Sequence, residues 1–251
     1  MFGAARNVFR LTAGIHDSEQ ASAAMNQKNI LPYDGLAYLI DDTKGEFEWP
    51  KATACLAETI PWRIETAGLF GRDMPVPRMT AWFGDADYTY SGICHRAAPF
   101  PAVVQRVRER AEAISAASYN AVLLILYRNG SDSVGWHSDH EAGLGDCPTI
   151  ASLSLGATRR FQLRHRGTKE TITLELSEGL WLVMAGETQR FWVHQVPKTT
   201  AAVERHINLT FRKLLNDLGS RAPSGTFTID VTQHDRPVVL IGGGYWRHAA
   251  S

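Results

Sequence analysis

The sequence predicts a mainly β protein with supporting helices, arranged as a β-sandwich or jelly roll. From residue 119 onward, seven short β-type runs follow one another with turn signals between them. Short runs at this close spacing are typical of sandwiches and barrels rather than of βαβ units. The seven runs are 119–127, 149–156, 159–165, 170–177, 180–186, 189–196 and 206–214.

The supporting helices are expected before these strands. Residues 100–117 form an amphipathic pattern, with apolar residues at helical spacing and charged residues opposite them. The apolar positions are Val103, Val107, Ala111 and Ile114. Residues 50–62 predict a second helix, because proline is tolerated in a first helical turn, where Pro50 stands. Residues 35–40 predict a short strand, and 76–92 predict strands or a hairpin.

The chain length indicates one domain with extensions. A chain of 251 residues can bury one sizeable core. We assign the domain to residues 48–215 and expect a partly ordered N-terminal arm at residues 1–47. Residues 216–251 are interpreted as a linker and a C-terminal tail, because 216–225 has the composition of a linker.

Composition favours a cytoplasmic, monomeric protein that does not enter a membrane. Apolar residues make up 44% of the chain and charged residues 21%, which is ordinary for a globular protein. No apolar run approaches the roughly 20 residues that span a bilayer. The three cysteines are scattered and form no CxxC pair, so neither a disulfide framework nor a zinc ribbon is indicated. Lys and Arg (26) balance Asp and Glu (26), so a nucleic-acid partner would need a local basic patch.

A candidate metal site begins in the segment GWHSDHE at residues 135–141. His137 and Asp139 are two residues apart, and in an extended segment such residues face the same way. His194 lies on a later predicted strand and is the candidate third ligand. Two histidines and one carboxylate on one face, with open positions, form the facial triad of non-heme Fe(II) oxygenases. An isolated HxD pair is more often a surface or hydrogen-bonded group, so other motifs must support this interpretation.

The run HINLTFRKL, at residues 206–214, alternates between apolar and polar residues. Its polar side carries His206, Asn208, Thr210 and Arg212. A strand commonly turns such a face to water, but in a small barrel the same face lines a cavity. An arginine inside a cavity requires an anion, and a dicarboxylate co-substrate would supply one through a bidentate pair.

Several separate motifs resemble those of the AlkB family of Fe(II)/2-oxoglutarate-dependent dioxygenases. The similarity extends in order over about residues 60–214 and includes PWRIE, LFGRDMPVPR and YTYSG. The longer motifs are LYRNGSDSVGWHSDHE, IASLSLGATRRFQLRHR, LVMAGETQRFWVHQVPK and INLTFRKL. The family fold is a double-stranded β-helix, a form of jelly roll. Its members use Fe(II), 2-oxoglutarate and O2 to remove alkyl groups from nucleobases such as 1-methyladenine and 3-methylcytosine.

The resemblance implies roles for individual residues. His137, Asp139 and His194 would hold the iron. Tyr127, Asn208 and Arg212 would bind 2-oxoglutarate, with Thr210 beside them. Tyr88, Thr89 and Tyr90 would line the base pocket, where Tyr90 stacks on a flipped base and His137 lies on the other side. His140 and Glu141 are expected to face the substrate.

The chain departs from the family pattern at three positions. The family usually has Asn-x-Tyr before the metal site, whereas this chain has Ile125, Leu126 and Tyr127. His206 replaces an arginine at the start of the RxNLTFR segment, and His140 stands where an aspartate is common. The first two changes weaken the expected hold on 2-oxoglutarate. We expect a protonated His206 to compensate, with its pKa raised by a nearby carboxylate.

The sequence therefore predicts an oxidative demethylase that acts on alkylated DNA. One alternative keeps the chemistry but changes the substrate to RNA or a small metabolite, as the balanced charge and His140 suggest. A second alternative is a lesion-binding module with impaired turnover, suggested by Ile125 and His206. Arg160, Arg164 and Arg166, with Lys169 nearby, are interpreted either as phosphate contacts or as an ordinary solvated face.

Overall fold

The computed structural model describes residues 27–45, 47–69, 72–90 and 93–215. It also describes three short segments, 227–229, 238–241 and 245–248. Most of the predicted arm at 1–47 and of the predicted tail at 216–251 therefore lies outside the described residues.

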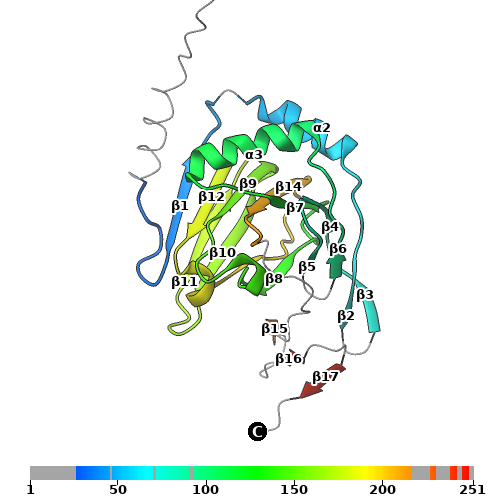
Figure 1. Ribbon diagram of the computed structural model, residues 1–251, viewed down its shortest axis with the longest axis vertical. Coiled ribbons are helices and arrows are strands. Elements are labelled where there is room, and N and C mark those ends of the chain that lie inside the picture. The colour runs from blue at the N-terminus through cyan, green and yellow to red at the C-terminus, as the bar shows by residue number, and fades with distance from the viewer. Residues whose placement is uncertain are drawn as a thin grey trace, which may run out of the picture.

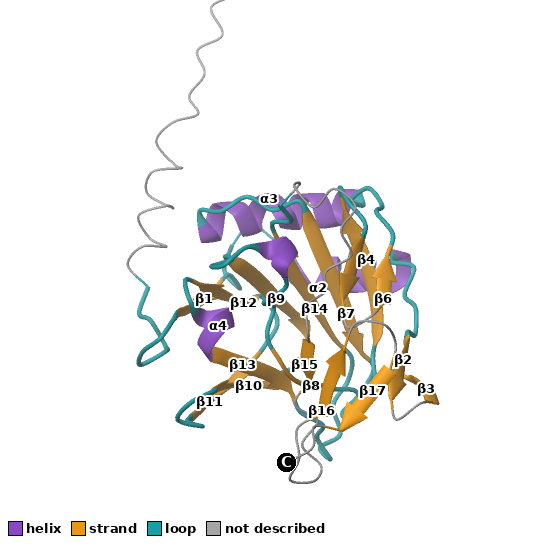
Figure 2. Ribbon diagram, turned by 60° about the horizontal axis from the view of Figure 1, so that its bottom comes forward, coloured by secondary structure: helices purple, strands orange, loops and turns teal. Residues whose placement is uncertain are grey.

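Two antiparallel sheets form the two layers of the domain (Figure 2). The six-stranded sheet has the order β1-β12-β9-β14-β7-β4, and the four-stranded sheet has the order β11-β10-β13-β8. The larger sheet consists of β1 (Leu36–Asp41), β4 (Met79–Gly84), β7 (Ala121–Tyr127), β9 (Ile150–Gly156), β12 (Leu180–Ala185) and β14 (His206–Arg212). The smaller sheet consists of β8 (Val134–His137), β10 (Arg159–His165), β11 (Thr171–Leu176) and β13 (Trp192–Val196).

Two helices, α2 (Trp49–Thr59) and α3 (Ala102–Ser115), cover the outer face of the larger sheet (Figure 1). Their apolar sides join side chains of β9, β12 and β14 in one core cluster. The cluster includes Leu56, Val107, Leu153, Trp181 and Phe211. Burying this area removes apolar surface from water and fixes the sheet from outside. The opposite face of the sheet is thereby left to face the second layer.

The remaining elements are two hairpins, two short helical turns and a group of three short strands. Two hairpins are formed by β2 (Thr66–Leu69) with β3 (Arg72–Pro75), and by β5 (Tyr88–Tyr90) with β6 (Ile93–His95). A single 3-10 turn, η1 (Ala142–Leu144), and a one-turn helix, α4 (Thr188–Phe191), complete the domain. Three short strands, β15 (Phe227–Ile229), β16 (Val238–Ile241) and β17 (Tyr245–His248), pair with one another. No helix in the described part of the chain is long and apolar enough to span a bilayer.

The predicted jelly roll is confirmed, and each of the seven predicted β runs contains a strand of the two sheets. Three details of the secondary structure differ from the prediction, because tertiary packing determines them. The run at 189–196 begins within α4, so only its second part is a strand. On α3, Val107, Ala111 and Ile114 are buried as predicted, but at the first position Val104 is fully buried and Val103 only partly. β4 and β5 do not pair with each other, because β4 pairs with β7 and β5 with β6.

Candidate metal centre and co-substrate cavity

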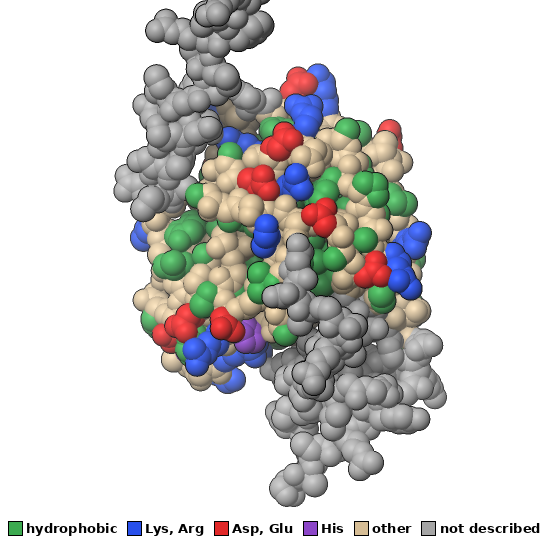
Figure 3. Space-filling model, viewed as in Figure 1, with side chains coloured by type: hydrophobic (Ala, Val, Ile, Leu, Met, Phe, Trp, Pro, Cys, Tyr) green, Lys and Arg blue, Asp and Glu red, His purple; other side chains and the backbone are tan. Residues whose placement is uncertain are grey.

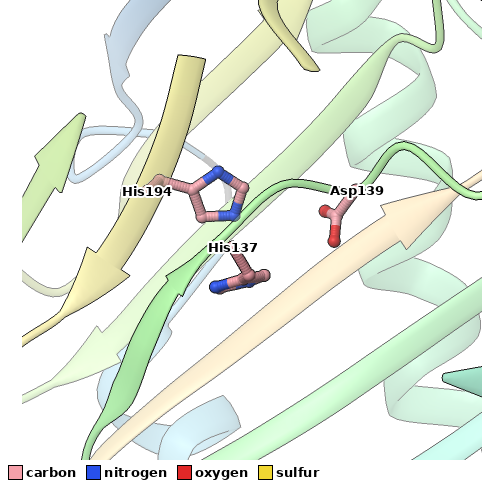
Figure 4. Close-up of side chains that lie close together, drawn as sticks. All are labelled: His137, Asp139 and His194. Carbon is pink, nitrogen blue, oxygen red and sulfur yellow. The ribbon is translucent and has the colours of Figure 1, made fainter. Parts of the chain in front are cut away.

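Three side chains that can ligate a metal meet between the two sheets. His137 ends β8, Asp139 lies just beyond it, and His194 lies on β13 directly opposite His137 in the strand pairing. One ligand atom from each of these residues lies within 4.8 Å of the others. Figure 4 shows the three side chains gathered between the strands. The structure thus brings together the two segments that the sequence separates.

Both imidazoles are held in the neutral form that a metal requires. His137 Nδ1 lies 2.8 Å from the Gly135 carbonyl oxygen, which can only accept, so Nδ1 carries the proton and Nε2 the lone pair. Burial lowers the pKa of His137. Burial, followed by the proximity of His137, lowers the pKa of His194 to about 3. His194 also stacks on Phe161, at 5.4 Å between ring centroids.

Asp139 is 1% exposed and is held from two sides. Its Oδ2 accepts a hydrogen bond of 2.9 Å from Arg212 Nη2, and its backbone N–H donates to Gln189 Oε1 at 2.9 Å. Burial is the largest influence and opposes ionisation, but the charge and hydrogen bond of Arg212, together with the two neighbouring imidazoles, hold the pKa of Asp139 below its usual range. Oδ1 is buried and has no hydrogen-bond partner among the described residues. A buried carboxylate oxygen without a partner, beside two neutral imidazoles, fits a divalent metal.

A cavity extends from these residues along the space between the sheets. The polar side of β14 lines it, as do Tyr127 and Phe161. Strand β14 therefore turns its polar face inward, and the solvent-facing alternative is wrong for this strand. The expected co-substrate residues on β14 that line the cavity are His206, Asn208, Thr210 and Arg212.

The chain matches the model of the 2OG-Fe(II) oxygenase superfamily over residues 40–212. The chain belongs to this superfamily. Membership implies Fe(II), 2-oxoglutarate and O2 as the reactive groups, and the cluster of His137, Asp139 and His194 suits the metal.

Curated relatives of this oxygenase support the narrower resemblance to the AlkB family. The chain is 38% identical over 182 residues to alpha-ketoglutarate-dependent dioxygenase alkB homolog 3 of Homo sapiens, covering 68% of this chain and 63% of that protein. It is 38% identical over 157 residues to DNA oxidative demethylase ALKBH2 of Mus musculus, covering 59% of this chain and 66% of that protein. The chain thus spans less than two thirds of the length of these relatives.

A solved structure, titled "The structure of OsALKBH1", shares the fold of the oxygenase. Its TM-score is 0.52 at 18% sequence identity, and the match covers 70% of this chain and 97% of that chain. At this low identity the likeness supports the fold alone, which agrees with the two-layered jelly roll described above.

The cavity wall includes Asn208, Thr210 and Arg212, which already make hydrogen bonds or ion pairs with neighbouring residues. Asn208 donates to Ser152 Oγ at 2.8 Å and to the Leu153 carbonyl at 3.1 Å, and it accepts from Thr210 Oγ1 at 2.7 Å. Arg212, which was expected to pair with a co-substrate carboxylate, pairs with Asp139. These residues stiffen the cavity wall, and contact with 2-oxoglutarate remains a proposal for each of them.

The expectation of a raised pKa at His206 is wrong. His206 Nδ1 lies 2.7 Å from the Ala157 carbonyl oxygen, so this nitrogen carries the proton and the ring has no proton on Nε2 when neutral. Burial lowers the pKa of His206 to about 4, and the nearby Arg159 guanidinium adds to this effect. The charge close to His206 is therefore a cation rather than a carboxylate, and the ring is neutral near pH 7.

The expected base-pocket residues lie near the metal cluster with different exposures. Tyr88 is buried and stacks on Trp82 at 4.7 Å between ring centroids, so one face of Tyr88 is covered. Glu141 is buried, and burial together with the charge of Asp139 raises the pKa of Glu141 to about 7. His140 is exposed beside them. The side chains of Thr89 and Tyr90 lie outside the described residues.

Three cavity or support residues were missed by sequence reasoning, namely Arg159, Phe161 and Gln189. Strand β10 alternates strictly, and Arg159 and Phe161 share its buried side with Leu163 and His165. That alternation is visible in the sequence, although only Arg160, Arg164 and Arg166 of the run and its end were assigned a candidate role above. Gln189 gave no signal, because it lies on the unexpected turn α4.

Acidic and basic side chains are interspersed on the face of the oxygenase seen in Figure 3. Arg160 pairs with Glu175 at 3.4 Å on the surface of the smaller sheet. Two other arginines contact the segment that carries the metal ligands. The Arg164 guanidinium lies 4.2 Å from the ring centroid of Trp136, and Arg166 donates to Ser138 Oγ at 2.7 Å. Among the basic residues considered as phosphate contacts, Arg164 and Arg166 therefore contact the segment that carries His137 and Asp139.

Replacing one metal ligand is expected to abolish tight metal binding. His194→Ala removes a ligand, so the affinity for Mn(II) should fall by more than about 100-fold in a calorimetric titration. His140→Ala, which removes an exposed histidine in the same neighbourhood, is the control and should bind the metal normally. Unchanged Mn(II) affinity in folded His194→Ala protein would contradict the assigned centre.

His206 is expected to make folding sensitive to acid. Its pKa is about 4 in the folded protein and about 6.5 when unfolded, so the unfolded state binds more protons between these values. The contribution of neutral His206 to stability is therefore fully present above pH 6.5. It is lost as the pH drops toward 4, which lowers the free energy of unfolding by up to about 3 kcal/mol. Urea denaturation across this range should show a smaller loss for His206→Gln than for wild type. His140→Gln should match wild type, and an equal loss in all three proteins would refute the assignment.

Proposed function

We propose that this chain is an Fe(II)- and 2-oxoglutarate-dependent dioxygenase that removes alkyl groups from damaged bases in DNA. The lesions would be of the 1-methyladenine and 3-methylcytosine type, with formaldehyde released. The observation that carries the proposal is the convergence of His137, Asp139 and His194 on the wall of a cavity that the polar side of β14 also lines. The name of the mouse relative, DNA oxidative demethylase ALKBH2, supports DNA as the substrate class.

The metal would be held by His137, Asp139 and His194. When bound, Fe(II) with 2-oxoglutarate and O2 supplies the oxidation of the alkyl carbon, and the chain supplies positions and surroundings. Three ligands from the protein leave coordination positions for the co-substrate and for oxygen. Tyr127 would take part in binding 2-oxoglutarate, since burial raises the pKa of Tyr127 to about 12 and keeps its hydroxyl a donor.

The neighbours of the ligands would orient them before the metal arrives. The carbonyl of Gly135 sets the tautomer of His137. Arg212 holds one carboxylate oxygen of Asp139, which leaves the other oxygen for the metal. Phe161 covers one face of His194 and keeps water from it. Such preorganisation lowers the cost of assembling the reactive geometry.

The damaged base would enter from the side of Tyr88, Glu141 and His140. A base in a duplex must leave the stack to reach the metal, which costs a few kcal/mol and less for a lesion that cannot pair. Glu141 is buried with a pKa of about 7, so its carboxyl is suited to either donating to or accepting from a base edge. Thr89 and Tyr90 are proposed to complete the pocket.

The decisive assay measures succinate and formaldehyde with Fe(II), 2-oxoglutarate and a methylated DNA oligonucleotide. We expect both products in equal amounts, with succinate stimulated well above the level seen with the unmethylated strand. His194→Ala should give neither product, because it lacks a metal ligand. Succinate without stimulation by DNA would point to RNA or a metabolite as substrate. Retained lesion binding without succinate would identify a binding module.

Arg164 is expected to contact the phosphate backbone beside the metal segment. Arg164→Ala should weaken DNA binding by a similar factor for all sequences and reduce the salt-dependence slope by about 1. Arg106→Ala is the matched control, because Arg106 also lies over an aromatic ring, that of Phe47, but on the helix-covered side. Fluorescence anisotropy at several salt concentrations measures both variants. Equal slopes for Arg164→Ala and wild type would exclude this contact.

A further inference from the structure

At the end of the cavity where β14 begins, the chain lacks the arginine that the family motif places at position 206. Ile125 and His206 lie at this end on neighbouring strands, and both line the cavity. Ile125 has no polar atom in its side chain, and the neutral His206 donates its only N–H to Ala157. Neither side chain therefore supplies a positive charge or a free donor to an anion in this part of the cavity.

A different arginine, Arg159, lies at this end of the cavity. It is 2% exposed and begins β10, on the inward side that also carries Phe161. Its guanidinium lies 5.2 Å from the ring centroid of Tyr127, and it lies close enough to His206 to affect the pKa of that ring. Phe161 stacks on the candidate metal ligand His194. Arg159 is the next inward-facing residue of β10, two residues before Phe161, and therefore lies about 6.6 Å from it along the strand.

The charge of Arg159 has no ion-pair partner among the described residues. Its hydrogen bonds go to the main-chain carbonyls of Asn129, Asp132 and Pro197, at 3.1, 2.8 and 3.0 Å. The nearby Asp132 carboxylate is held by Arg128 through two bonds, at 2.7 and 2.8 Å. Three of the five guanidinium N–H donors are thus used for positioning, and two remain for a ligand in the cavity.

A buried cation without a counter-ion is costly, and an anion in the adjoining cavity offsets that cost. The main-chain bonds hold the guanidinium in one orientation, so little entropy is lost when a ligand binds. The hydroxyl of Tyr127 lies in the same part of the cavity and stays protonated, which adds a neutral donor. This end of the cavity is therefore built to accept a carboxylate.

We propose that Arg159 binds the carboxylate of 2-oxoglutarate that does not reach the metal, replacing the arginine expected at position 206. The inference rests on the co-substrate assignment proposed above. It makes Arg159 the residue that distinguishes a dicarboxylic keto acid from a monocarboxylic one. Arg212, already paired with Asp139, serves the metal end of the cavity instead.

The test compares two keto acids that differ only at the far end. Calorimetric titrations of Mn(II)-loaded protein would use 2-oxoglutarate and 2-oxopentanoate, which has a methyl group in place of the second carboxylate. We expect wild type to prefer 2-oxoglutarate by roughly 10- to 100-fold, the range for a hydrogen-bonded charge. Arg159→Met and Arg159→Gln should lose that preference, with the affinity for 2-oxopentanoate unchanged.

Two further variants separate charge from structure. Arg159→Lys keeps the charge but not the planar fork, so it should retain part of the preference. Arg160→Met removes the neighbouring surface arginine, which pairs with Glu175, and should behave as wild type. Thermal unfolding and Mn(II) affinity of each variant show that the fold and the metal site are intact. If Arg159→Met does not fold, Arg159→Gln, which can still donate to a main-chain carbonyl, provides the neutral comparison.

Each outcome has a distinct meaning. Equal affinity of wild type for both keto acids, or an unchanged preference in a folded neutral variant of Arg159, would overturn the role of Arg159. Either result would leave the metal centre and the proposed reaction standing. Failure of both keto acids to bind the Mn(II)-loaded wild type would instead overturn the proposed function, since a co-substrate is required there.

Discussion

The buried ion pair between Asp139 and Arg212 is the interaction on which the arrangement of this cavity depends. It joins the segment after β8, from the smaller sheet, to the end of β14 in the larger one. Removing either partner would leave an uncompensated charge in the interior, which costs about 3–5 kcal/mol. The pair therefore fixes the distance between the two sheets at the metal end. It also leaves one oxygen of Asp139 without a hydrogen-bond partner beside the two imidazoles.

The interior between the sheets combines an apolar cluster with polar side chains that two strands turn inward. On β14 these are His206, Asn208, Thr210 and Arg212, and on β10 Arg159 is added. Each is tied to neighbours by the short hydrogen bonds described above, so the polar groups are oriented rather than loosely solvated. The other face of the larger sheet is covered by α2 and α3 in one apolar cluster, and a second apolar cluster, which includes Ile125 and Phe161, surrounds the cavity between the sheets.

Much of this organisation follows from local pattern. The strand runs, the alternation of β14 and the pairing of His137 with Asp139 are all periodic features, which sequence expresses directly. Three features were not predictable because they depend on which segments meet. The pKa of His206 is set by its burial and by Arg159, a residue far from it in sequence. Arg212 takes Asp139 as its partner only once the sheets are packed. The turn α4 interrupts a β-type run because Thr188 and Gln189 bond to β1 and to Asp139.

If Arg159 binds the co-substrate carboxylate as proposed, the site keeps its function although its residues have changed. A carboxylate in a cavity needs a cation within hydrogen-bond reach, but the need does not specify the strand that provides it. The family motif has an arginine at the start of β14, where this chain has the neutral His206. Strand β10 of the facing sheet carries Arg159, whose guanidinium has N–H donors that the main-chain carbonyls do not use. The main-chain carbonyls of Asn129, Asp132 and Pro197 make that exchange physically possible, because they orient Arg159 without neutralising it. An arginine paired with a fixed carboxylate would have been unable to take the same place.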